Sequence, residues 1–250
     1  MTTLARKAID VLKRVPRARA SLKGAPYSHF DLLEVDHKYG KMHRLHAAAH
    51  SGLINEIAGE HFGSVLEVAC GAGWNVPAFR TAGLAYTGMD ISETAIAAAA
   101  LKYPENRYLN IGLSDCAMIK SGSFDVVYNS SMLEHIGYFQ EAVAEMLRLA
   151  RRELWILFFE GLSDEPRNRI AFHPYSEEQI EGREKDIYGR KVILQDHIHE
   201  KRKGWYWNRY ARAEMLDIFR GSRDRIEILD RTNRPFLNDE SVLVVRKDPA

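Results

Sequence analysis

The sequence predicts an α/β domain built on a doubly wound, mostly parallel sheet, and three observations carry this prediction. Short apolar runs alternate with segments of helical periodicity from Ser64 onward, which is typical of parallel strands joined by helical crossovers. The first run leads directly into the glycine turn Gly71-Ala72-Gly73, and the second ends at the acidic residue Asp90. A glycine turn and an acidic strand end in this order are typical of doubly wound folds that bind a nucleoside.

Two helices are expected before the sheet. The first carries apolar residues at helical spacing until Pro16, which cannot continue a helix. Its apolar positions are Leu4, Ala8, Val11, Leu12 and Val15. The second helix follows a loop and has its apolar positions at Leu45, Ala49, Leu53 and Ile57. We therefore expect residues 1–63 to form an N-terminal helical extension.

Five buried strands and three helices are expected over residues 64–161, the core of the fold. The strands are the apolar runs Val65–Cys70, Tyr86–Ile91, Tyr108–Ile111, Phe124–Asn129 and Leu154–Phe159. The helices are Val76–Ala82, Glu93–Tyr103 and Tyr138–Arg151. Ser92 is the expected N-cap of the second of these helices, because a serine hydroxyl can accept a hydrogen bond from a free amide of the first turn.

The regular pattern is interrupted after Gly161 and resumes near Asn208. An unstructured loop of roughly 45 residues inside a compact domain is improbable without a functional reason. We therefore expect residues 162–207 to be an inserted cap that covers the substrate. Residues 208–250 are expected to complete the core with one helix and two strands. These elements are Asn208–Phe219, Ile226–Asp230 and Val242–Val245.

Composition limits the class of protein. With 250 residues, 46% of them hydrophobic, the chain can bury one substantial core. A formal net charge of +1 and a pI near 7.8 give no reason to expect nucleic acid or an anionic membrane as partner. Cys70 and Cys116 are the only cysteines, too few for a disulfide framework, and they imply a reducing cytoplasm. No apolar run is long enough to cross a bilayer.

The glycine turn and Asp90 together favour a bound nucleoside cofactor. Glycine adopts backbone angles that other residues avoid and lets a ligand approach the main chain closely. An acidic residue at the end of the next strand can accept hydrogen bonds from both ribose hydroxyls. A dinucleotide would require a small residue where Val76 stands, which weakens the nicotinamide alternative. An N-cap role for Asp90 is less attractive, because Ser92 is placed to fill it.

Four sequence blocks resemble the class I S-adenosylmethionine-dependent methyltransferases, in particular the small-molecule type related to the ubiquinone and menaquinone methyltransferases. The blocks are Val65–Val76, Tyr86–Ser92, Ser123–Val127 and Met132–Ile136. The resemblance covers about Ser64 to Glu160. It implies a Rossmann-like sheet of seven strands, the last of them antiparallel, and S-adenosylmethionine as cofactor.

The resemblance also implies a role for each matching residue. Glu67, Gly71 and Gly73 would surround the methionine moiety, and Asp90 would bind the ribose. Ile91 would stack on the adenine, with Asp115 and Cys116 at the adenine edge. Asn129 and Met132 would line the cofactor near the transferable methyl group, and Arg44 would pair with the cofactor carboxylate or lie exposed on its helix.

Methyl transfer requires a nucleophile placed in line behind an electrophilic methyl group, with water excluded. A hydroxyl nucleophile also needs a base, and histidine is suited to that role near neutral pH. His135, at the carboxyl edge of the sheet, is either this base or a structural support. His197 and His199 in the inserted segment are further candidates, and the run Asp196–His199 leaves a metal site as a minority alternative. The aromatic cluster of Trp205, Tyr206, Trp207 and Tyr210 either walls the pocket or anchors the cap.

The function expected from these observations is S-adenosylmethionine-dependent methylation of a small molecule, with O-methylation preferred, no metal ligand assigned and no nucleic acid expected as partner. An enclosed site favours a small acceptor over a macromolecule. Two alternatives stay open: methylation of RNA or protein, suggested by basic residues in the first 24 positions and in the inserted segment, and a non-catalytic partner protein that keeps the fold.

Overall fold

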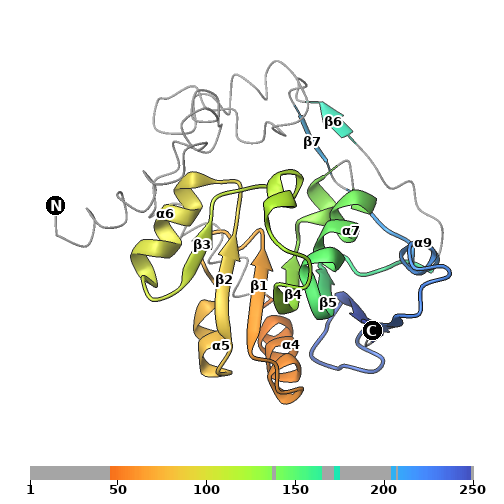
Figure 1. The fold of residues 1–250 in the computed structure, drawn as a ribbon. Coiled ribbons are helices and arrows are strands. Elements are labelled where there is room, and N and C mark those ends of the chain that lie inside the picture. The colour runs from red at the N-terminus through yellow and green to blue at the C-terminus, as the bar shows by residue number, and fades with distance from the viewer. Residues whose placement is uncertain (1–45, 137–138, 165–171, 175–203, 207, 249–250) are drawn as a thin grey trace.

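The structure is a computed structural model, and it describes residues 46–136, 139–164, 172–174, 204–206 and 208–248. A seven-stranded sheet runs through the described chain, with helices on both sides (Figure 1). The strand order is β3-β2-β1-β4-β5-β9-β8. In the order of the chain, the strands are β1 (Ser64–Val68), β2 (Ala85–Met89), β3 (Arg107–Leu109), β4 (Phe124–Ser130), β5 (Ala150–Phe158), β8 (Arg225–Leu229) and β9 (Ser241–Arg246).

The first five strands are parallel to one another, and β9 is antiparallel to both of its neighbours, β5 and β8. The prediction of a doubly wound sheet of seven strands whose last strand is antiparallel is therefore confirmed. Reversal of the strand order between β1 and β4 places the carboxyl ends of these two strands beside each other. A crevice at such a reversal is where ligands of doubly wound folds bind.

Each face of the sheet buries its own apolar cluster, because alternate side chains of a strand point to opposite faces. On one face, Val65 and Val126 pack with residues of α4 (Ala47–Gly59), α5 (Val76–Thr81) and α6 (Glu93–Lys102). On the other face, Leu66 and Val127 pack with residues of α7 (Phe139–Leu149) and α9 (Arg212–Asp217). This coverage explains why the parallel strands are almost continuously apolar.

All predicted helices that fall within the described residues are present, and Ser92 is confirmed as an N-cap. Its hydroxyl accepts a hydrogen bond from the amide of Ala95 at 3.1 Å. Two short 3-10 helices, η1 (Leu113–Met118) and η2 (Leu133–His135), follow β3 and β4. None of the helices in the described ranges is long and apolar enough to cross a membrane.

Several predicted boundaries differ from the structure, by most at the start of β5 and at the start of α9. The helix expected to continue to Arg151 ends at Leu149, and β5 begins at Ala150, since Ala150 already pairs with Phe124 of β4. The exposed side chains of Arg151 and Arg152 conceal this start, because they break the apolar run by which the strand was recognised.

The helix expected from Asn208 begins only at Arg212. Residues 208–211 run along the loop after β4 instead, where the amide of Asn208 donates to the carbonyl of Glu134 at 2.8 Å. Ala211 forms an isolated bridge with Ser163, so these hydrogen bonds compete with the helical pattern.

In the segment expected to be a cap, the structure describes a small antiparallel pair, β6 (Phe172–Pro174) and β7 (Gly204–Tyr206). Figure 1 shows this pair beyond the carboxyl edge of the main sheet, and β7 lies beside η2. The helix expected near the N-terminus and most of residues 162–207 lie outside the described residues. The proposed domain limits therefore remain predictions.

Candidate active site

The glycine turn after β1 has the backbone shape that only glycine adopts easily. Gly71 and Gly73 have φ angles of +53° and +75°, in the left-handed region that disfavours side chains. A Cβ atom on Gly73 would also lie 3.2 Å from Val76 and 3.3 Å from both Ala99 and Tyr103. The turn is thus packed tightly against α6, and Gly71 and Gly73 carry no side chain that would keep a ligand from the main chain.

Asp90 connects the end of β2 to this turn. Its Oδ2 accepts a hydrogen bond from the amide of Gly71 at 2.8 Å, and its Oδ1 accepts one from the amide of Ser92 at 2.8 Å. Burial raises the pKa of Asp90, although both amides act in the opposite direction. Each carboxylate oxygen can accept a second hydrogen bond, so the group retains acceptor capacity for a ligand.

Glu67 lies buried beneath the turn, with 3% of its surface exposed. Its Oε1 accepts from Nδ2 of Asn75 at 2.6 Å and its Oε2 from the hydroxyl of Tyr86 at 2.5 Å. Burial raises the pKa of Glu67 to about 7 despite these two hydrogen bonds. Since Asn75 directly precedes α5, the carboxyl group ties the start of that helix to β1 and β2. The sequence reasoning missed both partners.

On the far side of Asp90, two predicted residues are accessible. Ile91 has 46% of its surface exposed, which is unusual for an isoleucine in this domain, and Asp115 on η1 is exposed. A Cβ atom on Gly112 would lie 3.2 Å from Cγ2 of Ile91, so the chain leading into η1 passes close to this side chain. An accessible apolar surface near an acid is suited to a planar base that carries an amino group.

Cys116, predicted with Asp115, has its side chain in the core. Its thiol lies 3.3 Å from the carbonyl oxygen of Gly112 and 3.4 Å from the sulfur of Met89. Burial raises its pKa to about 11. The thiol is therefore inert at neutral pH, and any contact of this residue with a ligand falls to its backbone.

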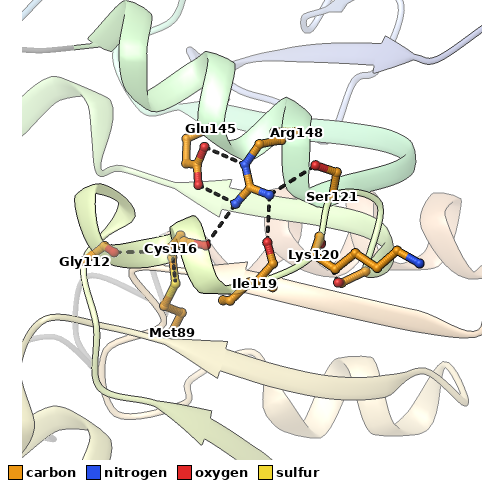
Figure 2. A network of polar contacts seen from close by, with 9 residues as sticks. Met89, Gly112, Cys116, Ile119, Lys120, Ser121, Glu145 and Arg148 are labelled. Carbon is orange, nitrogen blue, oxygen red and sulfur yellow. Dashed lines mark hydrogen bonds and ion pairs between the residues drawn. The ribbon is translucent and has the colours of Figure 1, made fainter. Parts of the chain in front are cut away.

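Arg148 of α7 holds η1 in place, as Figure 2 shows. Its guanidinium donates to the carbonyl oxygens of Ile119 at 2.7 Å and Cys116 at 3.0 Å. The same group donates to both carboxylate oxygens of Glu145, at 2.8 and 2.6 Å. Arg148 thus links the segment that carries Asp115 to a helix on the sheet, a role that sequence reasoning did not identify.

The carboxyl end of β4 presents polar atoms that lack a partner among the residues that the structure describes. Asn129 is fully buried, and its Nδ2 donates to the carbonyl of Val68 at 2.9 Å. Its Oδ1 has no hydrogen-bond partner among the described residues, and neither has the buried hydroxyl of Ser131. An unsatisfied buried acceptor is costly, so Asn129 marks a place that a ligand donor can satisfy. Met132, predicted beside it, is half-buried.

The loop after β4 contains a second buried acid. Glu134 is 6% exposed, and its Oε1 accepts from the amide of Phe159 at 3.1 Å. Its Oε2 has no partner in the described part of the chain, and burial raises its pKa to about 7. Tyr210 donates to the carbonyl of Leu133 at 2.6 Å, so Tyr210 anchors this loop. His135, predicted as a base, is half-buried beside it.

The structure therefore brings Glu67, Gly71, Gly73, Asp90 and Asn129 together around the ends of β1, β2 and β4. Three other predicted site residues, Arg44, His197 and His199, lie outside the described residues. The Asp196–His199 run proposed as a metal alternative lies there too. Within the described ranges, no group of three histidine, cysteine or acidic side chains is placed to hold a metal ion.

The fold and this site together define a class I methyltransferase domain, the class that uses S-adenosylmethionine. Residues 66–158 match the family model described as a methyltransferase domain. The strand order, with its antiparallel strand between two others, and the glycine turn joined to Asp90 agree with that match.

Curated proteins similar to this domain are named ubiquinone biosynthesis O-methyltransferases. The ubiquinone biosynthesis O-methyltransferase of Bordetella parapertussis is 32% identical over 122 residues, which are 47% of this chain and 50% of that protein. The enzyme of the same name from Thiobacillus denitrificans is 35% identical over 98 residues, covering 38% of this chain and 42% of that one. The chain therefore matches half or less of the length of these curated relatives.

Solved structures share the fold over most of the chain. A 1,6-didemethyltoxoflavin-N1-methyltransferase from Burkholderia thailandensis, with bound 1,6-didemethyltoxoflavin and S-adenosylhomocysteine, aligns with a TM-score of 0.55 at 16% identity, over 90% of this chain and 92% of that one.

Proposed function

We propose that this protein transfers the methyl group of S-adenosylmethionine to a hydroxyl group of a small molecule. One observation carries the cofactor part of the proposal: Oδ1 of Asn129, which has no partner in the described ranges, lies beside the turn whose Gly71 amide is held by Asp90. The preference for a hydroxyl rests on the curated relatives, which are named O-methyltransferases.

Each residue around the carboxyl edge of the sheet is assigned to one part of the cofactor, from the methionine moiety to the adenine. Gly71 and Gly73 leave main chain bare for the methionine moiety, and Asp90 accepts hydrogen bonds from the ribose hydroxyls. Ile91 covers the adenine, whose amino group donates to Asp115 while the backbone of Cys116 faces the ring edge. Asn129 accepts from the cationic amino group, and Met132 lines the methyl end.

Two ionisable residues complete the cofactor site. Glu67 lies below the turn, where a bound cationic cofactor would favour its ionised form, and Arg44 supplies the positive charge for the cofactor carboxylate. The cofactor supplies a sulfonium that makes its methyl group electrophilic. The protein must then orient an acceptor oxygen in line with this group and exclude water, since positioning carries most of the rate enhancement in such transfers.

The acceptor side lies over the ends of β4 and β5. His135 after β4 takes the proton of the acceptor or supports the loop. His197 and His199 of the segment 162–207, which lie outside the described residues, are the other histidines proposed for the acceptor. An enclosing segment of this kind suits a small molecule rather than a folded macromolecule. The free thiols of Cys70 and Cys116 support our placement of the reaction in the cytoplasm.

Calorimetric titration with S-adenosylmethionine, S-adenosylhomocysteine and NAD tests the cofactor. We expect micromolar binding of the first two and none of NAD. Asp90→Ala removes two ribose hydrogen bonds to a charged group, each worth about 1.5 kcal/mol at the low end, and should weaken binding of S-adenosylhomocysteine about 100-fold. Asp217→Ala, an exposed acid on α9, is the matched control and should bind normally.

Unchanged affinity in Asp90→Ala would reject our placement of the ribose. Binding of NAD alone would reject the methyltransferase proposal. Formation of S-adenosylhomocysteine from S-adenosylmethionine in the presence of phenolic acceptors, but not of amine acceptors, is the expected result of the acceptor screen. The opposite selectivity would replace O-methylation by N-methylation.

A further inference from the structure

A histidine–carboxylate pair lies near the acceptor side, among residues that have no role in the account above. Nδ1 of His46 lies 2.6 Å from Oε1 of Glu240. His46 directly precedes α4 and Glu240 directly precedes β9, so the fold joins positions 194 residues apart. Glu240 is 3% exposed, whereas a quarter of the His46 side chain is accessible.

This arrangement orients the imidazole for proton transfer. An ionised carboxylate can only accept a hydrogen bond, so Nδ1 of His46 carries the proton, and Nε2 of the neutral ring is left as the basic nitrogen. Oε2 of Glu240 is buried and has no partner among the residues that the structure describes. The carboxylate charge is therefore available to stabilise the imidazolium that forms when Nε2 accepts a proton, as in other histidine–carboxylate pairs.

Contacts of the histidine ring place the pair at the ends of β4 and β5. The ring of His46 stacks on Phe159, with centroids 4.0 Å apart and an angle of 22° between the planes. Phe159 directly follows β5, and its amide donates to Glu134 in the loop after β4. His50, one helical turn further along α4, lies with Nε2 3.4 Å from the hydroxyl of Ser130 at the end of β4.

In the proposed function, the neighbouring Asn129 accepts from the amino group of the cofactor, and Met132 lines the methyl end. His46 and this end of the site therefore lie at the same edge of the sheet. Phe159 is half-buried, and with His46 it forms a stacked aromatic surface there. A planar ring packs well against such a surface, which favours an aromatic acceptor.

We propose that His46, held by Glu240, is the general base that deprotonates a phenolic hydroxyl of the acceptor. The proposal rests on the proposed function, whose acceptor it makes more specific. The hydroxyl oxygen forms a bond to the methyl carbon as the carbon–sulfur bond breaks, and the electron pair of that bond stays on sulfur. The hydroxyl proton passes to Nε2 of His46 and later to solvent, so charge and atoms balance.

The test compares two acceptors, catechol and 4-nitrocatechol, at pH 7.5. The nitro group makes the hydroxyl far more acidic, so this acceptor ionises without help from the protein. Formation of S-adenosylhomocysteine is measured for the wild type and for His46→Gln, whose amide can still donate to Glu240 but cannot accept the proton. Loss of a general base typically costs about 100-fold or more in rate.

We expect His46→Gln to lower kcat at least 100-fold with catechol and less than tenfold with 4-nitrocatechol. Glu240→Gln should show the same difference between the two acceptors, with a smaller loss of kcat. Agreement between the two variants would exclude a folding defect in one of them as the cause. His61→Asn, an exposed histidine before β1 with φ of +58°, is the matched control, because asparagine tolerates that backbone conformation. Thermal unfolding and S-adenosylmethionine affinity are measured for every variant.

Three results would overturn the inference while leaving the proposed function intact. The first is an equal loss of kcat with catechol and 4-nitrocatechol in His46→Gln, and the second is no loss of kcat in that variant. The third is a loss of kcat that is large with catechol and small with 4-nitrocatechol in His135→Gln instead of His46→Gln. If the wild type binds S-adenosylmethionine but neither methylates nor binds 4-nitrocatechol, the phenolic acceptor and the assigned base are both wrong. Failure to bind S-adenosylmethionine would instead reject the proposed function itself.

Discussion

Glu67→Gln tests whether the acid beneath the glycine turn is buried in a state that resists ionisation. Glu67 is 3% exposed, and burial raises its pKa from the ordinary 4.5 to about 7. A carboxyl group whose pKa is higher in the folded state binds its proton more tightly there. Its contribution to stability is therefore complete below pH 4.5 and is lost as the pH rises through 7.

The size of this effect follows from the same two pKa values. Between pH 4.5 and pH 7, each pH unit lowers the free energy of unfolding by about 1.36 kcal/mol. The whole window amounts to about 3 kcal/mol. Glutamine cannot ionise, so the variant lacks this contribution. The wild type should thus lose about 3 kcal/mol relative to Glu67→Gln between pH 4.5 and pH 7, and nothing more above pH 8.

Urea unfolding of both proteins at half-unit intervals from pH 4.5 to pH 8.5 measures the difference. Tyr86→Phe is an informative companion, because the Tyr86 hydroxyl lowers the pKa of Glu67. Removing it should extend the fall in stability to higher pH. A difference between wild type and Glu67→Gln that stays constant with pH would refute the reasoning, since Glu67 would then ionise equally easily in both states.

Two further predictions concern the parts of the cofactor site that the tertiary structure positions. Arg148→Met removes the hydrogen bonds to the carbonyl oxygens of Cys116 and Ile119 and should weaken S-adenosylhomocysteine binding about tenfold, or about 1.4 kcal/mol. The loss should be smaller for the inosine analogue, which lacks the adenine amino group, so equal losses in calorimetry would contradict a role of Arg148 in positioning η1. Gly73→Ala places a side chain at φ +75° and within 3.3 Å of three others, which should lower the free energy of unfolding by about 2 kcal/mol and abolish cofactor binding. Unaltered urea unfolding of this variant would show that the turn relaxes without strain.

Much of the fold was predictable because parallel strands buried on both faces are continuous apolar runs. The runs that became β1, β2 and β4 were recognised for this reason, and Ser92 was recognised because capping is a local hydrogen bond. The start of β5 was missed because exposed Arg151 and Arg152 precede its apolar part. The start of α9 was missed because Asn208 bonds to a distant loop rather than to its own helix.

The candidate site likewise contains residues that the sequence predicted and residues that it did not. Gly71, Gly73 and Asp90 belong to short motifs, since the strand end and the turn that follows it are adjacent in the chain. Asn75 and Tyr86 complete the same site, yet neither carries a recognisable pattern, because their role depends on the buried carboxyl group they share. The spacing of His46 and His50 by one helical turn was the signal that sequence reasoning overlooked.

The sequence by itself determined the fold class, the order of the strands' apolar runs and the motif that defines a methyltransferase domain. Each of these depends on residues within one element or at one of its ends, where local periodicity and backbone preference decide the outcome. Only the tertiary structure decided that His46 faces Glu240, that Arg148 holds η1 and that Asn129 keeps an oxygen unpaired among the described residues. These contacts join segments far apart in the chain, and sheet order and packing, rather than local pattern, bring such segments together.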